Sequence, residues 1–448
     1  MLASNPTIRT TIFCLFTIAT AVPGWAGSWG TPAVLGTNAY LGSIALDAKG
    51  NMTSAWYQAL YSNGTLVGAQ VSASTASFGQ HWSTPVNISG SIGTGSSYPA
   101  VHSSAAGNVT AIYTNADVAG AFVDHPAGGN WGLPGVDNGA TNGSNEFFVV
   151  NDAGDQGLAW GIGTTRTAST VSAVYRQAGG VWSTVTTISA GPHAAFDGSV
   201  MTPDGTIAVA WESYNSVCGS RVCTTSNWVL HVTTHAPGAQ SWVDSGPLLG
   251  PDSSQHFGQL AADTLGDLGV ISLHAGNLVS LVRHGASWTA PAVVASTSAI
   301  GFYTGTGRDN RVYGSDTAGH ATFVSWNPGL TSLVEVDGNL TTNTWGKVTN
   351  ISGSDQNPNY FDFAMSSTGT AIAFWSIAGN GGNTIWRAAT RSGPGVSWNA
   401  PATVGTSFEG GGVPESVAVN GAGQAAVVFH GYSSDYLTYI LYTNTYQP

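Results

Sequence analysis

The chain consists of short runs in which apolar and polar residues alternate, separated by turns rich in Gly, Asn, Asp and Ser. Alternation with a period of two predicts β-strands that bury one face. Residues 197–212 are the clearest case, with an apolar run, a turn at Pro203, Asp204 and Gly205, and a second run ending on Trp211. No helical period of 3.6 residues persists in any segment, so we expect an all-β fold.

This hairpin recurs seven more times along the chain. Each copy has a turn glycine with a small or turn-forming residue three positions before it, and the spacing between copies ranges from 47 to 61 residues. The turn glycines are Gly50, Gly107, Gly154, Gly205, Gly266, Gly319, Gly369 and Gly423. The strand after the turn ends on Trp56, Tyr113, Trp160, Trp211, Leu273, Trp326, Trp375 or Phe429.

A second recurring piece is a tryptophan just after a polar turn. It occurs as Trp29, Trp82, Trp131, Trp182, Trp242, Trp288, Trp345 and Trp398, and in five copies a proline follows three residues later. Proline lacks a ladder donor and belongs on an edge, so this strand is the outermost of its unit. One more short strand lies between the two pieces.

Four antiparallel strands in about 50 residues, repeated eight times, predict an eight-bladed β-propeller. From residue 27 the chain begins with an outer-type strand at Trp29 and ends with three strands. We therefore expect the N-terminal outer strand to join the C-terminal blade and close the ring, because an open array would leave an unpaired edge.

The Trp, Gly and turn pattern over residues 28–448 resembles secreted bacterial β-propellers of the sialidase-like, lectin-like and polysaccharide-lyase-like kinds. The resemblance lies in the repeat architecture and not in one family. Sialidases carry Ser-x-Asp-x-Gly-x-x-Trp boxes on six blades, whereas these hairpins have Asp-x-x-Gly followed by a later Trp. Such propellers host lectins, lyases, hydrolases and protein-binding platforms, so the resemblance implies the fold more than an activity.

Residues 1–26 have the features of an export signal. Arg9 and the amino terminus precede an apolar stretch over residues 11–22, and small residues before Ala26 predict cleavage after it. The stretch is too short to span a bilayer, and no later segment is a transmembrane candidate. We expect a secreted, extracellular or periplasmic protein with one propeller domain over residues 27–448.

Charge narrows the range of partners. The chain has 11 Lys and Arg against 23 Asp and Glu, and nucleic acids and anionic membranes both require clustered basic residues. We therefore expect no nucleic-acid partner and no membrane insertion. We also expect no cofactor and a monomer.

Cys14 leaves with the signal, and the remaining pair, Cys218 and Cys223, predicts a disulfide in an exported protein, with two free thiols as the alternative. No metal site is expected, because no further ligands lie near this pair.

Two positions in the repeat vary where a purely structural position would keep its chemistry. The residue after the strand aromatic is Tyr57, Thr114, Gly161, Glu212, His274, Asn327, Ser376 or His430. The residue eight positions before the turn glycine is Gly42, Pro99, Glu146, Asp197, Gly258, Arg311, Phe361 or Glu415. Both positions point to the face that usually binds ligands in propellers.

These positions supply the candidate site. A histidine and a carboxylate on neighbouring loops can act as general base and acid. The expected catalytic residues are Glu212, His274, Asp197 and His430. The expected substrate-binding residues are Arg311, His256, Tyr57, Glu146, Glu415 and Tyr360.

The sequence is compatible with two classes of function. The first is a glycan-recognising propeller with one asymmetric site, acting as a binder or as a carbohydrate-active lyase or hydrolase on an extracellular polysaccharide. The second is a platform for protein interaction or adhesion that performs no chemistry. Polar residues collect on loops in any all-β protein, so the sequence alone leaves the choice to the structure.

Overall fold

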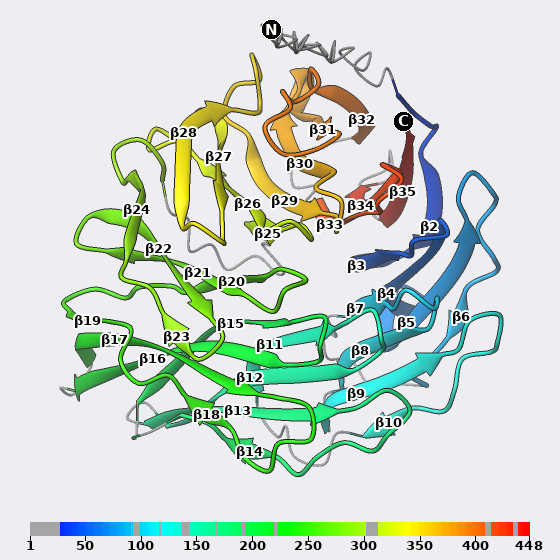
Figure 1. The fold of residues 1–448 in the computed structure, drawn as a ribbon. Coiled ribbons are helices and arrows are strands. Elements are labelled where there is room, and N and C mark those ends of the chain that lie inside the picture. The colour runs from blue at the N-terminus through cyan, green and yellow to red at the C-terminus, as the bar shows by residue number, and fades with distance from the viewer. Residues whose placement is uncertain are drawn as a thin grey trace, which may run out of the picture.

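The computed structural model describes residues 27–448, with gaps at residues 91, 93–98, 116–117, 137–142, 166–167, 190, 192, 219–222, 302–311, 408–413 and 433–437. It contains eight antiparallel sheets of four or five strands, arranged as the blades of a ring (Figure 1). Strand order follows the chain from the centre outward in seven blades, and in the eighth the N-terminal strands take the outer position. The prediction of an all-β, eight-bladed propeller is confirmed.

Blades one to four contain strands β3 to β19. Blade one is β3 (Ala39–Leu46), β4 (Asn51–Ser62), β5 (Thr65–Ser77) and β6 (Val86–Asn87). Blade two is β7 (Ala100–Ser103), β8 (Val109–Asn115), β9 (Val118–His125) and β10 (Gly135–Val136). Blade three is β11 (Gly143–Val150), β12 (Gln156–Thr165), β13 (Ala168–Arg176) and β14 (Thr186–Thr187). Blade four is β15 (Ala194–Met201), β16 (Ile207–Cys218), β17 (Cys223–His235), β18 (Val243–Asp244) and β19 (Leu249–Asp252).

Blades five to eight contain the remaining strands and one short 3-10 turn, η1 (Asn380–Gly382). Blade five is β20 (Gln259–Ala262), β21 (Leu268–His274), β22 (Asn277–His284), β23 (Ser287–Trp288) and β24 (Ala292–Ser296). Blade six is β25 (Tyr313–Ser315), β26 (His320–Trp326), β27 (Leu333–Asn339) and β28 (Thr344–Asn350). Blade seven is β29 (Asn359–Met365), β30 (Ala371–Ala378), β31 (Thr384–Arg391) and β32 (Ala402–Ser407). Blade eight is β33 (Pro414–Val419), β34 (Ala425–Tyr432), β35 (Tyr439–Gln447) and two N-terminal strands, β1 (Ser28–Trp29) and β2 (Ala33–Thr37).

The N-terminal strands close the ring as predicted. β1 pairs antiparallel with β35 at Ser28 and Gln447, and β2 pairs with the same strand at Val34 and Tyr442. The innermost strands then touch their neighbours in sequence around the centre, and β3 of blade one packs against β33 of blade eight. No helix within the described ranges is long and apolar enough to cross a membrane.

The repeated turn has a physical reason. All eight turn glycines have a φ between 78° and 91°, a region that only glycine occupies without strain. The residue three positions earlier is buried in every copy, and where it is Asp its carboxylate accepts backbone N–H groups of the turn, as Asp47 does from Lys49 and Asn51. The residue three positions before the glycine therefore accepts hydrogen bonds from N–H groups for which the backbone of the turn provides no acceptor.

The outer tryptophans pack against the end of the third strand of their own blade. His125 contacts Trp131 and His235 contacts Trp242, with ring centroids 4.8 and 5.1 Å apart. Arg391 lies over Trp398 with its guanidinium carbon 5.0 Å from the ring centroid. This contact explains why the tryptophan recurs although its strand is short.

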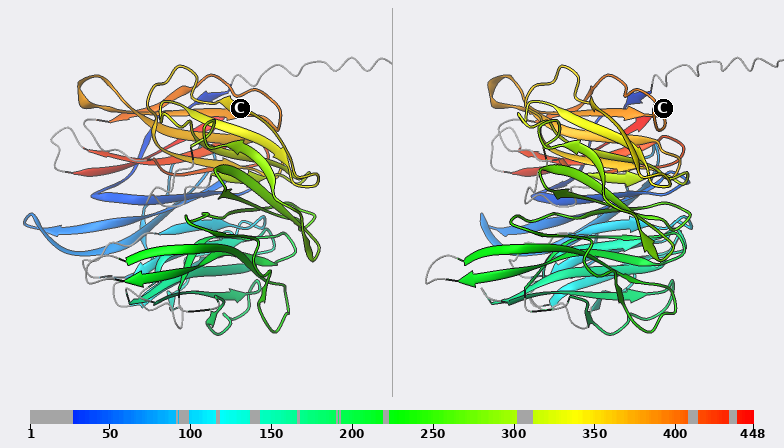
Figure 2. Two further views of the ribbon diagram at one scale, coloured as in Figure 1. Left: turned by 90° about the vertical axis from the view of Figure 1, so that its left-hand side faces the viewer. Right: turned by 60° about the vertical axis from the view of Figure 1, so that its left-hand side comes forward.

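The two faces of the second strand serve different neighbours. In blade four, Val209 and Trp211 pack toward blade three, where they meet Ala159. Ala210 points the other way and packs with Leu268 of blade five. Alternation along one strand therefore fills both interfaces of a blade. Figure 2 shows that the β4–β5 and β16–β17 hairpins, drawn in blue and green, project from the same side of the ring.

Candidate functional site

The second variable position, eight residues before the turn glycine, falls on a β-bulge of the innermost strand in blades four and eight. Phe196 pairs with Trp211 and Gly198 pairs with Ala210, so Asp197 between them has no partner in the ladder. The same break in blade eight isolates Glu415. A bulged residue can turn its side chain out of the regular alternation. Both carboxylates reach the next blade, where Asp197 accepts the Gly258 N–H at 2.9 Å and Glu415 accepts the Leu41 N–H at 2.9 Å.

The structure brings Asp197 and Glu212 together at the interface of blades four and five. Glu212 follows Trp211 on β16 and is fully buried, with 0% of its surface exposed. Its Oε1 accepts the backbone N–H of His256 at 2.6 Å and of Phe257 at 2.5 Å. Three consecutive N–H groups that lead into β20 therefore bind two carboxyl groups of blade four.

Burial raises the pKa of both carboxyls, and the neighbouring Asp197 raises the pKa of Glu212 further. The backbone hydrogen bonds from Phe257 and His256 oppose this rise only in part. Glu212 Oε2 is buried and accepts no hydrogen bond from an N–H or O–H group of the described residues. A proton on Glu212, shared with Asp197, satisfies that oxygen and removes the repulsion between two carboxylates.

His256, His274 and Asp252 form a second group at the same interface, with Asp252 at the end of β19 in blade four and His274 at the end of β21 in blade five. His274 Nδ1 lies 2.7 Å from Asp252 Oδ2, which leaves Nε2 of a side chain that is 32% exposed. The buried His256 places Nδ1 at 2.7 Å from the Leu273 carbonyl oxygen and Nε2 at 3.1 Å from the Trp228 carbonyl oxygen.

The ligand atoms of this group lie within 4.8 Å of one another, a spacing that suits a metal ion. Both of the neighbours of the His256 ring nitrogens are carbonyl oxygens, which only accept hydrogen bonds, so whichever nitrogen of His256 carries the proton donates it to the backbone. A metal ion would have to compete with these contacts for the imidazole.

A third group lies across the ring, at the interface of blades eight and one. Glu415 binds His430 through Nδ1, and the His430 ring meets the edge of Tyr439 at 5.7 Å. Tyr439 contacts Tyr40 at 5.3 Å, and Tyr40 contacts the buried Tyr57 at 4.8 Å. The hydroxyl of Tyr432, 2.6 Å from that of Tyr439, and burial together raise the pKa of Tyr439 to about 12. Three predicted site residues, Glu415, His430 and Tyr57, are thus joined through tyrosines.

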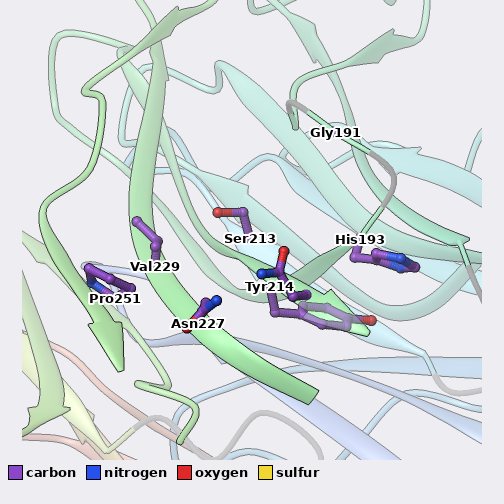
Figure 3. A pocket seen from close by; sticks show the side chains of 8 residues that line it. Gly191, His193, Ser213, Tyr214, Asn227, Val229 and Pro251 are labelled. Carbon is purple, nitrogen blue, oxygen red and sulfur yellow. The ribbon is translucent and has the colours of Figure 1, made fainter. Parts of the chain in front are cut away.

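A cavity of about 460 Å³ lies on the face of the β16–β17 hairpin that is opposite to Glu212 (Figure 3). Ser213, Tyr214, Asn227, His193 and their neighbours line it, and the described residues of the wall include no Asp, Glu, Lys or Arg. The Tyr214 ring stacks on Trp228, with centroids 4.2 Å apart and planes 25° from parallel. The Tyr214 hydroxyl lies 3.0 Å from Ser169 Oγ, which holds the ring in place.

The remaining predicted residues are placed less clearly. Tyr360 is 51% exposed at the start of β29, with a φ of 40°. Glu146 lies in β11, but its side chain and all of Arg311 fall outside the described residues. Cys218 and Cys223 face each other across the β16–β17 ladder. The disulfide stays a prediction, because both side chains lie outside the described part of the chain.

None of the predicted site residues whose side chains the structure describes lines the blade-four cavity. Glu212 and the cavity residue Ser213 are neighbours on β16, so their side chains point to opposite faces. Sequence reasoning missed Ser213, Tyr214 and Asn227, because it compared only two positions per repeat. One signal was present: three residues after the strand aromatic, six blades have Ala or Gly, and only blades four and eight have Tyr. The six are Ala59, Ala116, Gly163, Gly276, Gly329 and Ala378.

No protein-family model and no curated protein matches the chain. Solved structures with a similar ring include the lectin of Aleuria aurantia in complex with α-methyl-L-fucoside, at 13% identity over 84% of this chain and 98% of that one, with a TM-score of 0.39. The NanB sialidase of Streptococcus pneumoniae is 12% identical over 95% and 71%, with a TM-score of 0.35. A polysaccharide lyase, an ulvan lyase, is 8% identical over 70% and 77%, with a TM-score of 0.38. These are the kinds of propeller that the repeat pattern resembles, and at this level of similarity they assign no activity.

Proposed function

We propose that the protein is a secreted glycan-recognising propeller that binds a neutral, hydroxyl-rich ligand at one site, the blade-four cavity. The proposal is carried by the described residues of the cavity wall, none of which is Asp, Glu, Lys or Arg. Tyr214, backed by Trp228, supplies a ring against which a sugar can pack, and Asn215, Asn227 and Ser213 supply amide and hydroxyl groups. Such a mixture of an aromatic surface and a few polar groups suits small polar ligands.

The position of Tyr214 supports a single site. A multivalent lectin needs the same pocket residues in several blades, whereas most blades have Ala or Gly at this position. Blade eight has Tyr432 there, but Tyr432 contacts Tyr439 at 4.5 Å within the tyrosine group. The repeat therefore offers Tyr432 as a matched control for Tyr214.

Replacing Tyr214 by alanine should weaken glycan binding about tenfold or more, because the variant loses the aromatic surface of the cavity. An array of neutral oligosaccharides identifies the ligand, and calorimetric titration then compares the wild type with Tyr214→Ala and Tyr432→Ala. We expect the Tyr432 variant to bind like the wild type. Equal losses in both variants contradict the single site. An array without any bound glycan, together with one stoichiometric protein partner in a pull-down, favours the interaction platform instead.

A lyase or glycoside hydrolase is the second candidate function, and the Asp252–His274 pair favours it. Asp252 holds His274 by Nδ1, and the partly exposed ring keeps Nε2 for proton transfer. The shared proton of Asp197 and Glu212 lies on the same interface and gives the pair a candidate acid. Since Glu212 is fully buried, Asp197, which is partly exposed, is the member that can meet a ligand.

If the protein cleaves a polysaccharide, His274→Ala should reduce turnover at least about 100-fold while leaving the melting temperature almost unchanged. His284 is the matched control, because its Nδ1 also lies close to an aspartate, 2.9 Å from Asp267. His274 lies beside the first residue of β22, whereas His284 is the last residue of that strand. Turnover is followed by new reducing ends, and the absorbance of an unsaturated product distinguishes a lyase from a hydrolase. Unchanged turnover in His274→Ala, or an equal loss in His284→Ala, removes this assignment.

A further inference from the structure

Three polar side chains form a row across blade four, on the face that carries the cavity. Ser213 Oγ lies 3.2 Å from His231 Nε2. His231 Nδ1 lies 3.3 Å from Asp244 Oδ2. Ser213 belongs to β16, His231 to β17 and Asp244 to β18, so one residue comes from each of three adjacent strands.

The strand register produces this row. His231 pairs with Trp211, and Asp244 pairs with Thr233. Ser213 is two residues beyond Trp211 and therefore shares its face of the sheet. The Trp211 ring lies flat against the imidazole of His231, with centroids 4.2 Å apart and planes 9° apart, which fixes the orientation of the ring.

The hydrogen bonds in the row have a defined direction. Asp244 is a carboxylate and accepts, so His231 donates from Nδ1. The second nitrogen, Nε2, is then the acceptor for the hydroxyl proton of Ser213. Ser213 is half-buried and lines the cavity, so its Oγ is accessible to a ligand there (Figure 3).

The repeat does not require these residues. In the other blades the position that pairs with the strand aromatic or with Leu273 has no histidine: it is Ser72, Ala121, Ser172, Leu278, Leu333, Arg387 or Tyr442. Blade four alone combines a histidine at this position with a serine that faces a cavity. A purely structural hydrogen bond would not need that combination.

We propose that Ser213, His231 and Asp244 form a nucleophilic triad that hydrolyses uncharged acyl esters bound in the blade-four cavity. A serine activated by a histidine, which a carboxylate orients in turn, is defined by geometry and not by fold. The described residues of the cavity wall include no Asp, Glu, Lys or Arg, which favours an uncharged acyl group. The identification of the alcohol part of the ester as a glycan rests on the proposed function.

The reaction proceeds in two balanced halves. Ser213 Oγ attacks the ester carbonyl carbon while His231 Nε2 takes the hydroxyl proton. The carbon–oxygen bond to the alcohol then breaks, and His231 returns the proton to the departing alcohol. Water attacks the acyl-serine, His231 takes a proton from this water and gives it to Ser213, and the carboxylic acid leaves. The side-chain amides of Asn215 and Asn227 line the same cavity and supply N–H donors for the oxyanion.

A fluorophosphonate probe tests the nucleophile on the unmodified protein, so the test does not depend on the folding of a variant. We expect one adduct, located at Ser213 by peptide mass spectrometry. Ser226, an exposed serine on the neighbouring β17, is the internal control and should remain unlabelled. An adduct at a different serine, or no adduct, overturns the proposal.

Hydrolysis of p-nitrophenyl acetate provides the kinetic test. Ser213→Ala should lower the rate at least about 100-fold, whereas Ser226→Ala should retain it. Asp244 acts through His231, so Asp244→Asn should lower kcat and leave KM and the melting temperature unchanged. An unchanged rate in Ser213→Ala overturns the triad. Because neither probe contains a sugar, labelling of Ser213 without any glycan binding would leave the triad standing and reject only the proposed function.

Discussion

Replacing Arg391 by methionine should lower the free energy of unfolding by about 3–5 kcal/mol. The Arg391 side chain is almost completely buried at the end of β31 and binds Glu335 at 2.9 Å and Asp337 at 2.8 Å on the third strand of blade six. It also donates to Thr322 and lies over Trp398. The variant leaves two carboxyl groups without a counter-charge at an interface between blades. Urea unfolding followed by tryptophan fluorescence measures the loss.

The pKa values of Glu335 and Asp337 shift in opposite directions next to Arg391, so a test of this cluster can be made specific. Burial raises the pKa of Glu335 although Arg391 opposes it, whereas the hydrogen bonds and charge of Arg391 hold the pKa of Asp337 low despite burial. Adding Glu335→Gln and Asp337→Asn to the Arg391 variant removes the stranded charges. We expect this triple variant to recover a large part of the lost stability. A loss below about 1 kcal/mol in the single variant would show that the cluster is not a stabilising contact between blades.

Replacing Glu212 by glutamine should stabilise the protein at neutral and alkaline pH. The amide oxygen can accept the His256 and Phe257 N–H groups, as Oε1 does in the wild type. The amide N–H₂ then lies where Oε2 was and can donate to Asp197. The variant therefore keeps the hydrogen bonds of the protonated carboxyl without needing a proton.

The sign of the pH dependence follows from the raised pKa of Glu212 and Asp197. The unfolded chain releases the shared proton near the usual carboxyl pKa of about 4, whereas the folded protein retains it. The contribution of this pair to the free energy of unfolding is thus greatest below that pH and falls as the pH rises toward the raised folded-state pKa. While one proton separates the two states, the loss is about 1.4 kcal/mol per pH unit.

Unfolding free energies measured between about pH 5 and about pH 8 test this pair. The difference between Glu212→Gln and the wild type should increase with pH in favour of the variant. Glu212→Ala is the control, because it leaves both backbone N–H groups without an acceptor and should be less stable at every pH. A difference between Glu212→Gln and the wild type that does not change with pH would refute the shared proton.

Part of the candidate site was accessible from sequence comparison. The variable positions identified Asp197, Glu212, His430 and Glu415, and the structure joins these residues in pairs at two interfaces on opposite sides of the ring. The comparison did not reveal that Asp197 and Glu415 occupy bulges, because a bulge depends on pairing with the neighbouring strand. Nor did it reveal that Glu212 binds two N–H groups 44 and 45 residues later in the chain.

His231 shows how much tertiary context changes an interpretation. In the sequence it is four residues from His235 and resembles half of a metal pair, a possibility that the strand rise excludes. Only the pairing of three strands places His231 between Ser213 and Asp244, which are 31 residues apart in the sequence. A catalytic arrangement of this kind leaves no local motif.

By itself, the sequence determined the eight blades, the four strands in each and the closure by the N-terminal strand. These features depend on local chemistry: a glycine that tolerates positive φ, a polar residue that caps the turn, and a tryptophan that covers the end of a strand. The tertiary structure alone decided which polar residues meet. Bulges, strand register and the packing of one blade on the next set those meetings, and each of them joins residues that are distant along the chain.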